Sequence, residues 1–200
     1  MIQFKNLKNK HPFAKLKEIY DVAVSFEQKS IEAMALSTFD QTILEVNSRY
    51  VNAKFIDEDK IIFFSNYESV KAKDINSNNT VSCLFYWDSV RVQIRIKGII
   101  TMCDPSFSDD YFKNRDQKKN ALAISSNQSK KIESYEDVIK KYNNILNKDK
   151  NFLETRPAYW GGYMIEASYI EFWEGNNQRL NKREAFNLVN EVWHKSILEP

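Results

Sequence analysis

The segment Val90–Thr101 limits the possible folds of this chain more than any other, because apolar and polar residues alternate along it. The apolar members are Val90, Val92, Ile94 and Ile96, and the residues between them are Arg91, Gln93, Arg95 and Lys97. A period of two predicts a β-strand with one apolar face and one basic, amide-bearing face. The simplest interpretation of the polar face is that it is solvated, as on an antiparallel sheet with one buried side.

Other segments also have the composition of strands. We expect strands at Ala33–Thr38, Arg49–Ile56, Ile61–Ser65, Val81–Trp87, Gly162–Glu166, Tyr169–Trp173 and Glu191–Ile197. The second and third of these flank a polar turn, which is typical of a hairpin. Val81–Trp87 is apolar apart from Ser82, which predicts a strand buried on both sides.

Apolar residues recur at intervals of three or four elsewhere, and this spacing predicts helices. We expect helices at Pro12–Lys29, Ser69–Ile75, Ser106–Asn114, Lys118–Ser126 and Glu133–Leu146. Residues 1–11 are polar and predict a mobile N-terminal arm, and Asn147–Arg156 predicts a charged linker. The order of elements predicts a mainly β (α+β) chain, in which residues 12–200 form one antiparallel barrel-like domain with helical insertions.

The composition argues against several kinds of functional site. The four glycines are Gly98, Gly161, Gly162 and Gly175, and their spacing cannot form a glycine-rich phosphate loop. Histidine and cysteine occur twice each, so we expect no metal site and no nucleophilic dyad built on them. We expect both cysteines to be reduced, buried thiols of a cytosolic protein.

Charge and hydropathy argue against two classes of partner. The chain has 29 basic and 27 acidic residues, a formal net charge of +2, which is unlike a polybasic nucleic-acid-binding arm. Its apolar stretches are far shorter than the roughly 18 residues that span a bilayer. Residues 1–17 also lack the apolar core of a secretory signal. We therefore expect a cytoplasmic protein that binds neither nucleic acid nor membrane.

Basic residues accompany the predicted strands and turns. They include Arg49, Lys54, Lys71, Arg115, Arg179 and Arg183. Guanidinium and ammonium groups form charge-assisted hydrogen bonds with phosphate, so a phosphorylated small molecule is a candidate ligand. Taken singly, each of these charges is more simply interpreted as a solvated surface group.

Short motifs follow one another along the chain in a characteristic order. They are RYVNAK (49–54), FFSN (63–66), SVKA (69–72), Gln93 before Gly98, YFKNR (111–115), Gln128–Ser129, WGG (160–162), EFW (171–173) and RLNKR (179–183). From about Ala33 to Pro200 this ordered set closely resembles the pyridoxine (pyridoxamine) 5′-phosphate oxidase family. The resemblance implies an FMN-binding split β-barrel that works as a homodimer with its flavin sites at the subunit interface. It also implies an oxidase that converts pyridoxine 5′-phosphate or pyridoxamine 5′-phosphate to pyridoxal 5′-phosphate and reduces molecular oxygen to hydrogen peroxide.

The resemblance further implies which residues bind the FMN cofactor. Arg49 and Lys71 would hold the FMN phosphate, with Ser65 and Ser69 nearby. The residues around the flavin ring and ribityl chain would be Gln93, Gln128, Ser129, Trp173 and Arg183. Amide side chains suit the ring edge, which presents both donors and acceptors.

By the same resemblance, the substrate phosphate would be bound by Lys54, Tyr111, Arg115 and Lys119, and Lys54 would touch both ligands. Arg179 and Asn181 would be the catalytic residues, with Arg179 over the substrate ring, opposite the flavin. Because Arg49 and Lys54 are five residues apart, a regular strand would point them to opposite faces, unless a bulge intervenes.

Three positions depart from the usual residues of that family. Asn181 stands where the turn normally reads Arg-Leu-His, Lys119 where a phosphate-binding serine is usual, and Val70 where a basic residue usually precedes Lys71. Asparagine does not titrate near neutral pH, so a possible proton-transfer group is missing. Two alternatives remain open: a divergent FMN-dependent oxidoreductase of the same fold with another substrate, as in phenazine biosynthesis, or a non-enzymatic protein that binds FMN or a vitamer phosphate.

Overall fold

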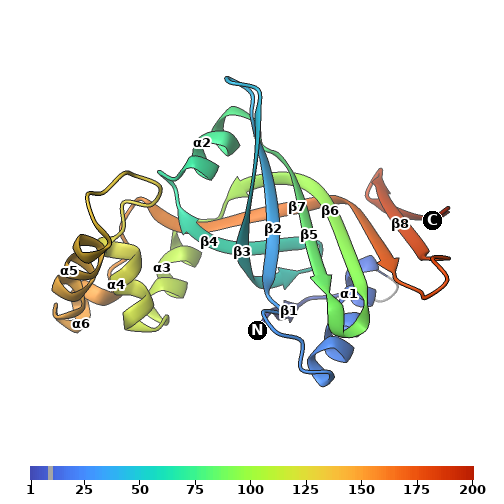
Figure 1. Ribbon diagram of the computed structural model, residues 1–200, viewed down its shortest axis with the longest axis horizontal. Helices are drawn as coiled ribbons and strands as arrows, with labels where there is room; N and C mark the ends of the chain where they lie inside the picture. The colour runs from blue at the N-terminus through green and yellow to red at the C-terminus, as the bar shows by residue number, and fades with distance from the viewer. Residues whose placement is uncertain (9–10) are drawn as a thin grey trace.

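The computed structural model describes residues 1–8 and 11–200, and the strands in this part of the chain form one continuous sheet (Figure 1). The strands are β1 Gln3–Lys5, β2 Ala33–Asp40, β3 Glu45–Asp57, β4 Lys60–Asn66, β5 Thr80–Trp87, β6 Val92–Met102, β7 Trp160–Glu174, β8 Lys182–Val189 and β9 Val192–Leu198. The helices are α1 Pro12–Ser25, α2 Val70–Ser77, α3 Pro105–Lys113, α4 Gln117–Ser125, α5 Tyr135–Leu146 and α6 Lys150–Glu154, with one 3-10 turn, η1, at Asp88–Val90.

The sheet closes because β3 has partners on both sides. Antiparallel pairing runs from β3 to β2, β5, β6 and β7, and β4 joins β7 back to β3. The strands β8 and β9 extend the sheet beyond β7. The helices α3 to α6 lie together at one end of the molecule and β8 lies at the other (Figure 1). The prediction of an antiparallel split barrel with helical insertions is therefore confirmed.

The apolar face of β6 fills the interior of this barrel, as its alternation predicted. Val92, Ile94 and Ile96 are buried, whereas Gln93 and Arg95 on the other face are partly exposed. The period-two sequence of β6 is thus matched by one buried face.

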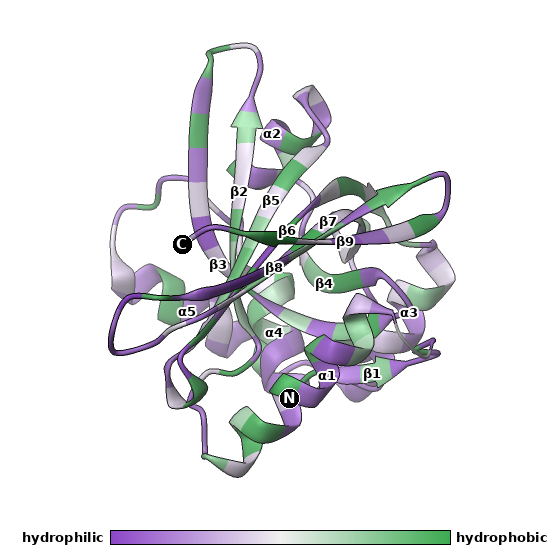
Figure 2. Ribbon diagram, turned by 90° about the vertical axis from the view of Figure 1, so that its right-hand side faces the viewer, coloured by the Kyte–Doolittle hydropathy of each residue, from purple (hydrophilic) through white to green (hydrophobic). Residues whose placement is uncertain are grey.

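The β2–β3 hairpin projects from the barrel (Figure 2), and there the pattern of burial differs. Val46 and Tyr50 of β3 are exposed, whereas the polar Asn47 and Arg49 are partly buried, so apolar residues do not mark a buried face in this part of the strand.

Two irregularities shape the long strands. Pairing between β3 and β4 shifts between Ala53 and Phe55, so one extra residue is accommodated in β3. A second shift, at Gly98 of β6, lets β7 continue as a single strand where the sequence predicted two. A Cβ atom on residue 98 would lie 2.1 Å from the Glu166 carbonyl oxygen, so only glycine permits this close approach.

The N-terminal segment differs from the predicted mobile arm. Residues Gln3–Lys5 form β1 and pair in parallel with the end of β3, and Ile2 is buried. Tyr20 of α1 fixes this segment by accepting a hydrogen bond from the Ile2 amide, 3.0 Å from its hydroxyl oxygen. Residues 9 and 10, also within the predicted arm, lie outside the described residues.

Two other predicted segments need correction, and one strand was missed. The charged linker contains α6, whose first turn is capped by Asp149 and whose Leu153 is buried. The strand β5 is buried on one side only in this chain, since Thr80, Ser82 and Tyr86 are exposed. The strand β8 was not predicted, because it follows the predicted turn closely and its alternation is weak.

Candidate functional site

A cavity of about 1100 Å³ lies against β1, β3, the end of β4 and the start of α2, with α3 and α4 on its other side. The predicted site residues that line it are Arg49, Lys54, Ser65, Lys71, Tyr111, Arg115, Lys119, Gln128 and Ser129. They come from segments that are far apart in the sequence, and the barrel brings them together. The cavity therefore contains the groups expected to bind both phosphates.

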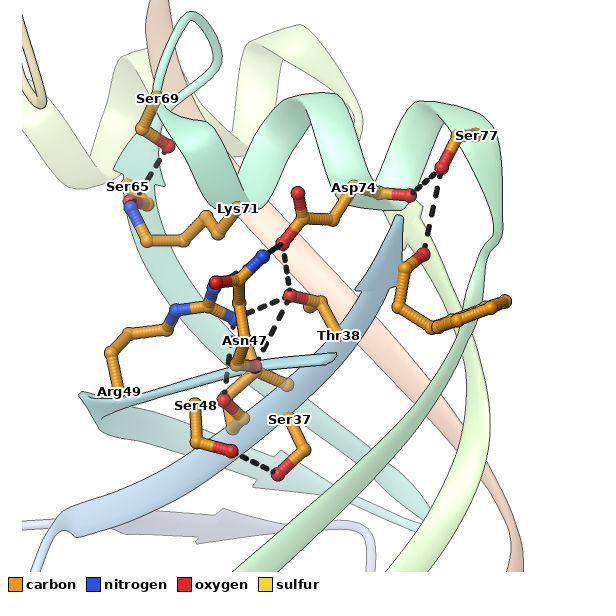
Figure 3. Close-up of polar contacts among 12 residues, drawn as sticks. Ser37, Thr38, Asn47, Ser48, Arg49, Ser65, Ser69, Lys71, Asp74 and Ser77 are labelled. Carbon is orange, nitrogen blue, oxygen red and sulfur yellow. Dashed lines mark hydrogen bonds and ion pairs between the residues drawn. The ribbon is translucent and has the colours of Figure 1, made fainter. Parts of the chain in front are cut away.

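Lys71, in the first turn of α2, lies at the centre of a polar cluster in the cavity wall (Figure 3). Its Nζ donates hydrogen bonds to Ser65 Oγ at 2.8 Å, Ser69 Oγ at 2.9 Å and Gln128 Oε1 at 3.0 Å. Ser69 precedes α2 but does not cap it with its side chain, because its hydroxyl donates to the Asn66 carbonyl oxygen. All three partners of the ammonium are neutral, so they leave its charge available to an anion in the cavity.

The environment of Lys71 opposes its positive charge. Its side chain is almost fully buried, with 7 % exposed. Burial, and then the nearby charge of Arg49, lower the pKa of Lys71 to about 8, against an opposing effect of Asp74. A bound anion would reverse this effect, because an opposite charge favours the protonated amine.

Arg49 of β3 is held by acceptors on two neighbouring elements (Figure 3). Its Nη1 donates to Thr38 Oγ1 at 2.5 Å and to the Leu36 carbonyl oxygen at 3.3 Å, both on β2. Its Nη2 donates to Asp74 Oδ2 of α2 at 3.3 Å. These contacts fix the guanidinium group at the cavity wall.

Aromatic side chains form another part of the cavity wall. The Tyr111 and Phe64 rings are stacked with an interplanar angle of 6°, and the Trp160 ring lies 5.3 Å from that of Phe64. The Arg115 guanidinium group lies over the Trp160 ring, 5.0 Å from its centroid. Burial raises the pKa of the Tyr111 hydroxyl, with Arg115 opposing, so this group remains a hydrogen-bond donor.

Arg115 is positioned by the junction between α3, α4 and α6. Its Nη1 donates to the Lys119 carbonyl oxygen at 3.1 Å and to Asn120 Oδ1 at 3.5 Å. The buried Asn120 amide in turn donates to the carbonyl oxygens of Phe112 and Leu153, both at 2.9 Å. The helical insertion therefore supplies a rigid support for a cation in the cavity.

Lys54 lies where the pairing register of β3 shifts. Both Lys54 and Arg49 line the cavity, and so do the consecutive residues 50–52 between them, so the cavity reaches both faces of β3 and shared lining does not contradict the prediction that the two side chains face opposite sides. The Lys54 Nζ also lies 3.4 Å from Glu32 Oε1, in a partly exposed ion pair.

Ser69 is fully buried behind Lys71 and does not line the cavity, and the other predicted residues form a second group that also lies outside the lining. Gln93, Trp173 and Arg183 lie side by side across β6, β7 and β8, because Gln93 pairs with Trp173 and Trp173 pairs with Arg183. Next to them is Glu171, which is 1 % exposed and accepts hydrogen bonds from Arg183 Nε at 2.8 Å and Arg95 Nη1 at 3.1 Å. A buried carboxylate thus orients two arginines on the outer face of the sheet.

Arg179 and Asn181 belong to this second group through the turn between β7 and β8. Arg179 has a φ of 62°, in the left-handed region, and Asn181 Oδ1 accepts a hydrogen bond from the Asn176 amide at 3.1 Å. Leu180 between them is exposed. Within one chain, this turn is not part of the cavity wall.

Sequence reasoning missed several residues of the site. Gln3 and Lys5 of β1 line the cavity, and the Lys5 Nζ lies 4.7 Å from the centre of the Phe55 ring. Asp74 and Thr38 lie behind Arg49 and were not predicted. The i, i+3 spacing of Asp74 and Lys71 on one helix was the only signal in the sequence that linked Asp74 to the site.

Within the described residues, no group of three or more His, Cys, Asp or Glu side chains is arranged to hold a metal ion. In the same part of the chain, no helix has the length and apolar character needed to cross a bilayer.

The closed barrel and its cationic cavity define a split-barrel protein with a site suited to anionic ligands. A family model described as pyridoxamine 5′-phosphate oxidase matches residues 23–150, and one described as the pyridoxine 5′-phosphate oxidase C-terminal dimerisation region matches residues 160–200. The chain belongs to the pyridoxamine 5′-phosphate oxidase family. Members of this family bind FMN.

Relatives and solved structures agree with this assignment. The chain is 31% identical over 193 residues to a pyridoxine/pyridoxamine 5′-phosphate oxidase of Synechocystis, covering 95% of this chain and 88% of the relative. It is 36% identical over 168 residues to the protein of that name from Leptospira biflexa, covering 84% and 79%. The fold is similar to that of PhzG from Burkholderia lata, solved in complex with tetrahydrophenazine-1-carboxylic acid, with a TM-score of 0.87, 24% identity and coverage of 95% and 93%. It is also similar to a pyridoxamine 5′-phosphate oxidase-related, FMN-binding protein from Nostoc punctiforme, with a TM-score of 0.75, 13% identity and coverage of 92% and 97%.

Proposed function

We propose that this protein is an FMN-dependent oxidase that converts pyridoxine 5′-phosphate or pyridoxamine 5′-phosphate to pyridoxal 5′-phosphate, with molecular oxygen reduced to hydrogen peroxide. The observation that carries this proposal is that one cavity contains two sets of anion-binding side chains. Arg49 and Lys71 form one set, and Lys54, Arg115 and Lys119 form the other. A flavin mononucleotide and a phosphorylated substrate each require such a set.

The donors around Lys71 fit the phosphate of FMN. The ammonium of Lys71 and the guanidinium group of Arg49 supply charge, and the hydroxyl of Ser65, which lines the cavity, supplies a neutral hydrogen-bond donor. The uncapped start of α2 adds backbone N–H groups directed toward an anion. Gln128 and Ser129 line the same cavity and would contact the ribityl chain or the ring.

The second set of side chains fits the phosphate of the substrate. Arg115 is held rigidly by Asn120, and the Tyr111 hydroxyl remains protonated and can donate. Lys119 adds an ammonium group at the position where the family usually has serine, and it binds as a mobile point charge. Lys54 would contact both the substrate phosphate and the cofactor.

A homodimer would complete the site. The C-terminal segment 160–200 matches a dimerisation region, and it carries Trp173, Arg179, Asn181 and Arg183. These residues lie outside the cavity wall of their own chain, so in our proposal a second protomer delivers them to the cavity. Each of the two sites would then combine the cavity of one protomer with these C-terminal residues of the other.

The bound flavin would supply the two-electron oxidation of the substrate and the subsequent reaction with oxygen. The side chains of this protein bind and orient the two ligands. Arg179 would hold the substrate ring against the flavin, and Asn181 would donate or accept a hydrogen bond there without exchanging a proton near neutral pH. Glu171 orients Arg183, which would place a cation near the flavin ring and favour its reduced, anionic form.

The test begins with the purified full-length protein and added FMN. A flavin absorbance that remains with the protein after gel filtration supports cofactor binding, and failure to bind FMN at any concentration tested would refute the proposal. Anaerobic addition of pyridoxine 5′-phosphate should then bleach the flavin, and air should restore it with formation of hydrogen peroxide. A flavin that stays oxidised with both pyridoxine and pyridoxamine 5′-phosphate would refute the assigned substrate.

Asn181 favours one alternative, a flavin-dependent oxidoreductase of the same fold that acts on another substrate. The fold match to PhzG, which was solved with a phenazine precursor, fits this alternative as well. The variant Asn181→His separates the two. A large rise in turnover of pyridoxamine 5′-phosphate supports the alternative, since it shows that the native residue is adapted to a different substrate, whereas substantial wild-type turnover supports the oxidase.

A further inference from the structure

Asp74 is a buried carboxylate directly behind the proposed phosphate site, on the turn of α2 that follows Lys71 (Figure 3). It is 1 % exposed, and it is not among the residues that line the cavity. Its Oδ2 accepts hydrogen bonds from Thr38 Oγ1 at 2.5 Å, Asn47 Nδ2 at 3.3 Å and Arg49 Nη2 at 3.3 Å. Burying a carboxylate costs free energy even when it is paired. Stability alone therefore does not explain why a carboxylate with three donors is placed here.

The contacts of Arg49 show what Asp74 contributes. Nη1 uses both of its hydrogens, on Thr38 Oγ1 and the Leu36 carbonyl oxygen, and Nη2 uses one on Asp74. Among the described residues, no acceptor is recorded for Nε–H or for the second hydrogen of Nη2. These two N–H groups belong to one edge of the guanidinium plane, and such an edge can bind a phosphate with two parallel hydrogen bonds.

We propose that Asp74 is a positioning residue that, together with Thr38, fixes the guanidinium plane of Arg49 so that its free edge is presented to the FMN phosphate. This inference rests on the proposed function, because it assumes that the anion at Arg49 and Lys71 is the phosphate of FMN. Asp74 does not touch the cofactor and acts through Arg49. Without it, the long Arg49 side chain regains rotational freedom that must be lost again when the phosphate binds.

A purely electrostatic role would have the opposite sign. A negative charge near an anion site weakens anion binding, so removal of Asp74 would then strengthen the binding of FMN. A positioning role predicts that removal of Asp74 weakens the binding of FMN. The direction of the change in affinity therefore distinguishes the two roles.

The experiment compares FMN and riboflavin binding, by quenching of flavin fluorescence, in the wild-type protein and in Asp74→Ala, Asp74→Asn and Thr38→Val. Riboflavin has the same ring and no phosphate. We expect Asp74→Ala to weaken FMN binding about tenfold and to leave riboflavin binding unchanged. Asp74→Asn should recover most of the loss, because its amide oxygen can still accept from Arg49, and Thr38→Val should weaken FMN binding about threefold.

The control is Glu184→Gln, which alters another buried carboxylate, one that contacts lysines and not Arg49. It should leave the ratio of FMN to riboflavin affinity unchanged. Unchanged or tighter FMN binding in Asp74→Ala would overturn the inference, as would an equal loss of riboflavin binding. If Asp74→Ala does not fold, tighter FMN binding by Asp74→Asn or an unchanged affinity of Thr38→Val overturns it instead. Failure of the wild-type protein to bind FMN refutes the proposed function and is distinct from each of these results.

Discussion

The lowered pKa of Lys71 predicts how the affinity for FMN depends on pH. In the protein without ligand the pKa is about 8, because the ammonium is buried and lies near Arg49. A phosphate dianion beside it stabilises the charged form and raises the pKa again. Above pH 8, FMN binding is therefore coupled to uptake of one proton, and the affinity must fall as the pH rises.

The size of this effect follows from the same pKa. With a ligand-free pKa of about 8 and a much higher value in the complex, the dissociation constant rises about tenfold between pH 7 and pH 9. This change corresponds to about 1.4 kcal/mol. Below pH 7 the lysine is almost fully charged, so its contribution to the pH dependence disappears there.

The assay is a titration of flavin fluorescence at constant ionic strength from pH 6.5 to about pH 9.5. Lys71→Arg should keep the affinity for phosphate and lose the pH dependence, because guanidinium stays charged throughout. Lys71→Met should bind FMN at least about tenfold more weakly at pH 7, since a charge-assisted hydrogen bond is lost, and should show no dependence on pH. Riboflavin measured in parallel corrects for titration of the ring.

Two results would refute this reasoning. A wild-type dissociation constant for FMN that stays the same from pH 7 to pH 9 would show that Lys71 does not titrate near 8 or does not contact the phosphate. If the dissociation constant of Lys71→Met for FMN changes with pH as much as that of the wild type, the titration belongs to another group.

Three further predictions concern other charged groups. Burial acts to raise the pKa of Glu184, but hydrogen bonds from neighbouring lysines outweigh this effect and lower the pKa to about 2. The ionised Glu184 therefore stabilises the fold above its unfolded pKa near 4.5, and this stabilisation is lost as the pH falls toward 2. Thermal melting at pH 7 and pH 3 should therefore show that Glu184→Gln removes about 1–2 kcal/mol of acid-sensitive stability, and equal acid sensitivity of both proteins would contradict this. Glu171→Gln leaves Arg95 and Arg183, which are both partly exposed, without a carboxylate and should lower the unfolding free energy in urea by about 1 kcal/mol, whereas an unchanged unfolding free energy would show that these ion pairs do not contribute to stability. Lys119→Ser should raise the KM for the phosphorylated substrate several-fold with unchanged FMN affinity, and an unchanged KM would remove Lys119 from the substrate site.

Local patterns in the sequence predicted the strands that have one apolar face. The β6 prediction succeeded because its polar residues face outward and its apolar residues face the barrel interior. The β5 prediction failed on its outer face, where Tyr86 is exposed and Leu84 partly exposed, so apolar composition did not indicate burial. The helix α6 was missed because one buried residue, Leu153, fixes it among charged neighbours.

The candidate site was predicted from the order of its motifs and not from spacing. Lys71 and Arg115 are far apart in the chain, and only the closed barrel places both at one cavity. Asp74 was not predicted, because its partners Thr38 and Arg49 lie 36 and 25 residues away in the sequence. Such long-range contacts have no local signature, and the same holds for the parallel pairing that brings Lys5 to the cavity.

The extra residue in β3 gives the cavity a cation without displacing its aromatic wall. Ala53 and Ile56 both belong to the barrel core although they are three residues apart, and Phe55 between them lines the cavity. In a regular strand of the same length Phe55 would share the core face with Ala53. Because the pairing with β4 passes over Lys54, deletion of this one residue would restore regular alternation, with Ala53 and Ile56 still in the core and Phe55 still at the cavity. The bulge therefore lets β3 carry one more cavity residue than its pairing requires, and that residue is the lysine.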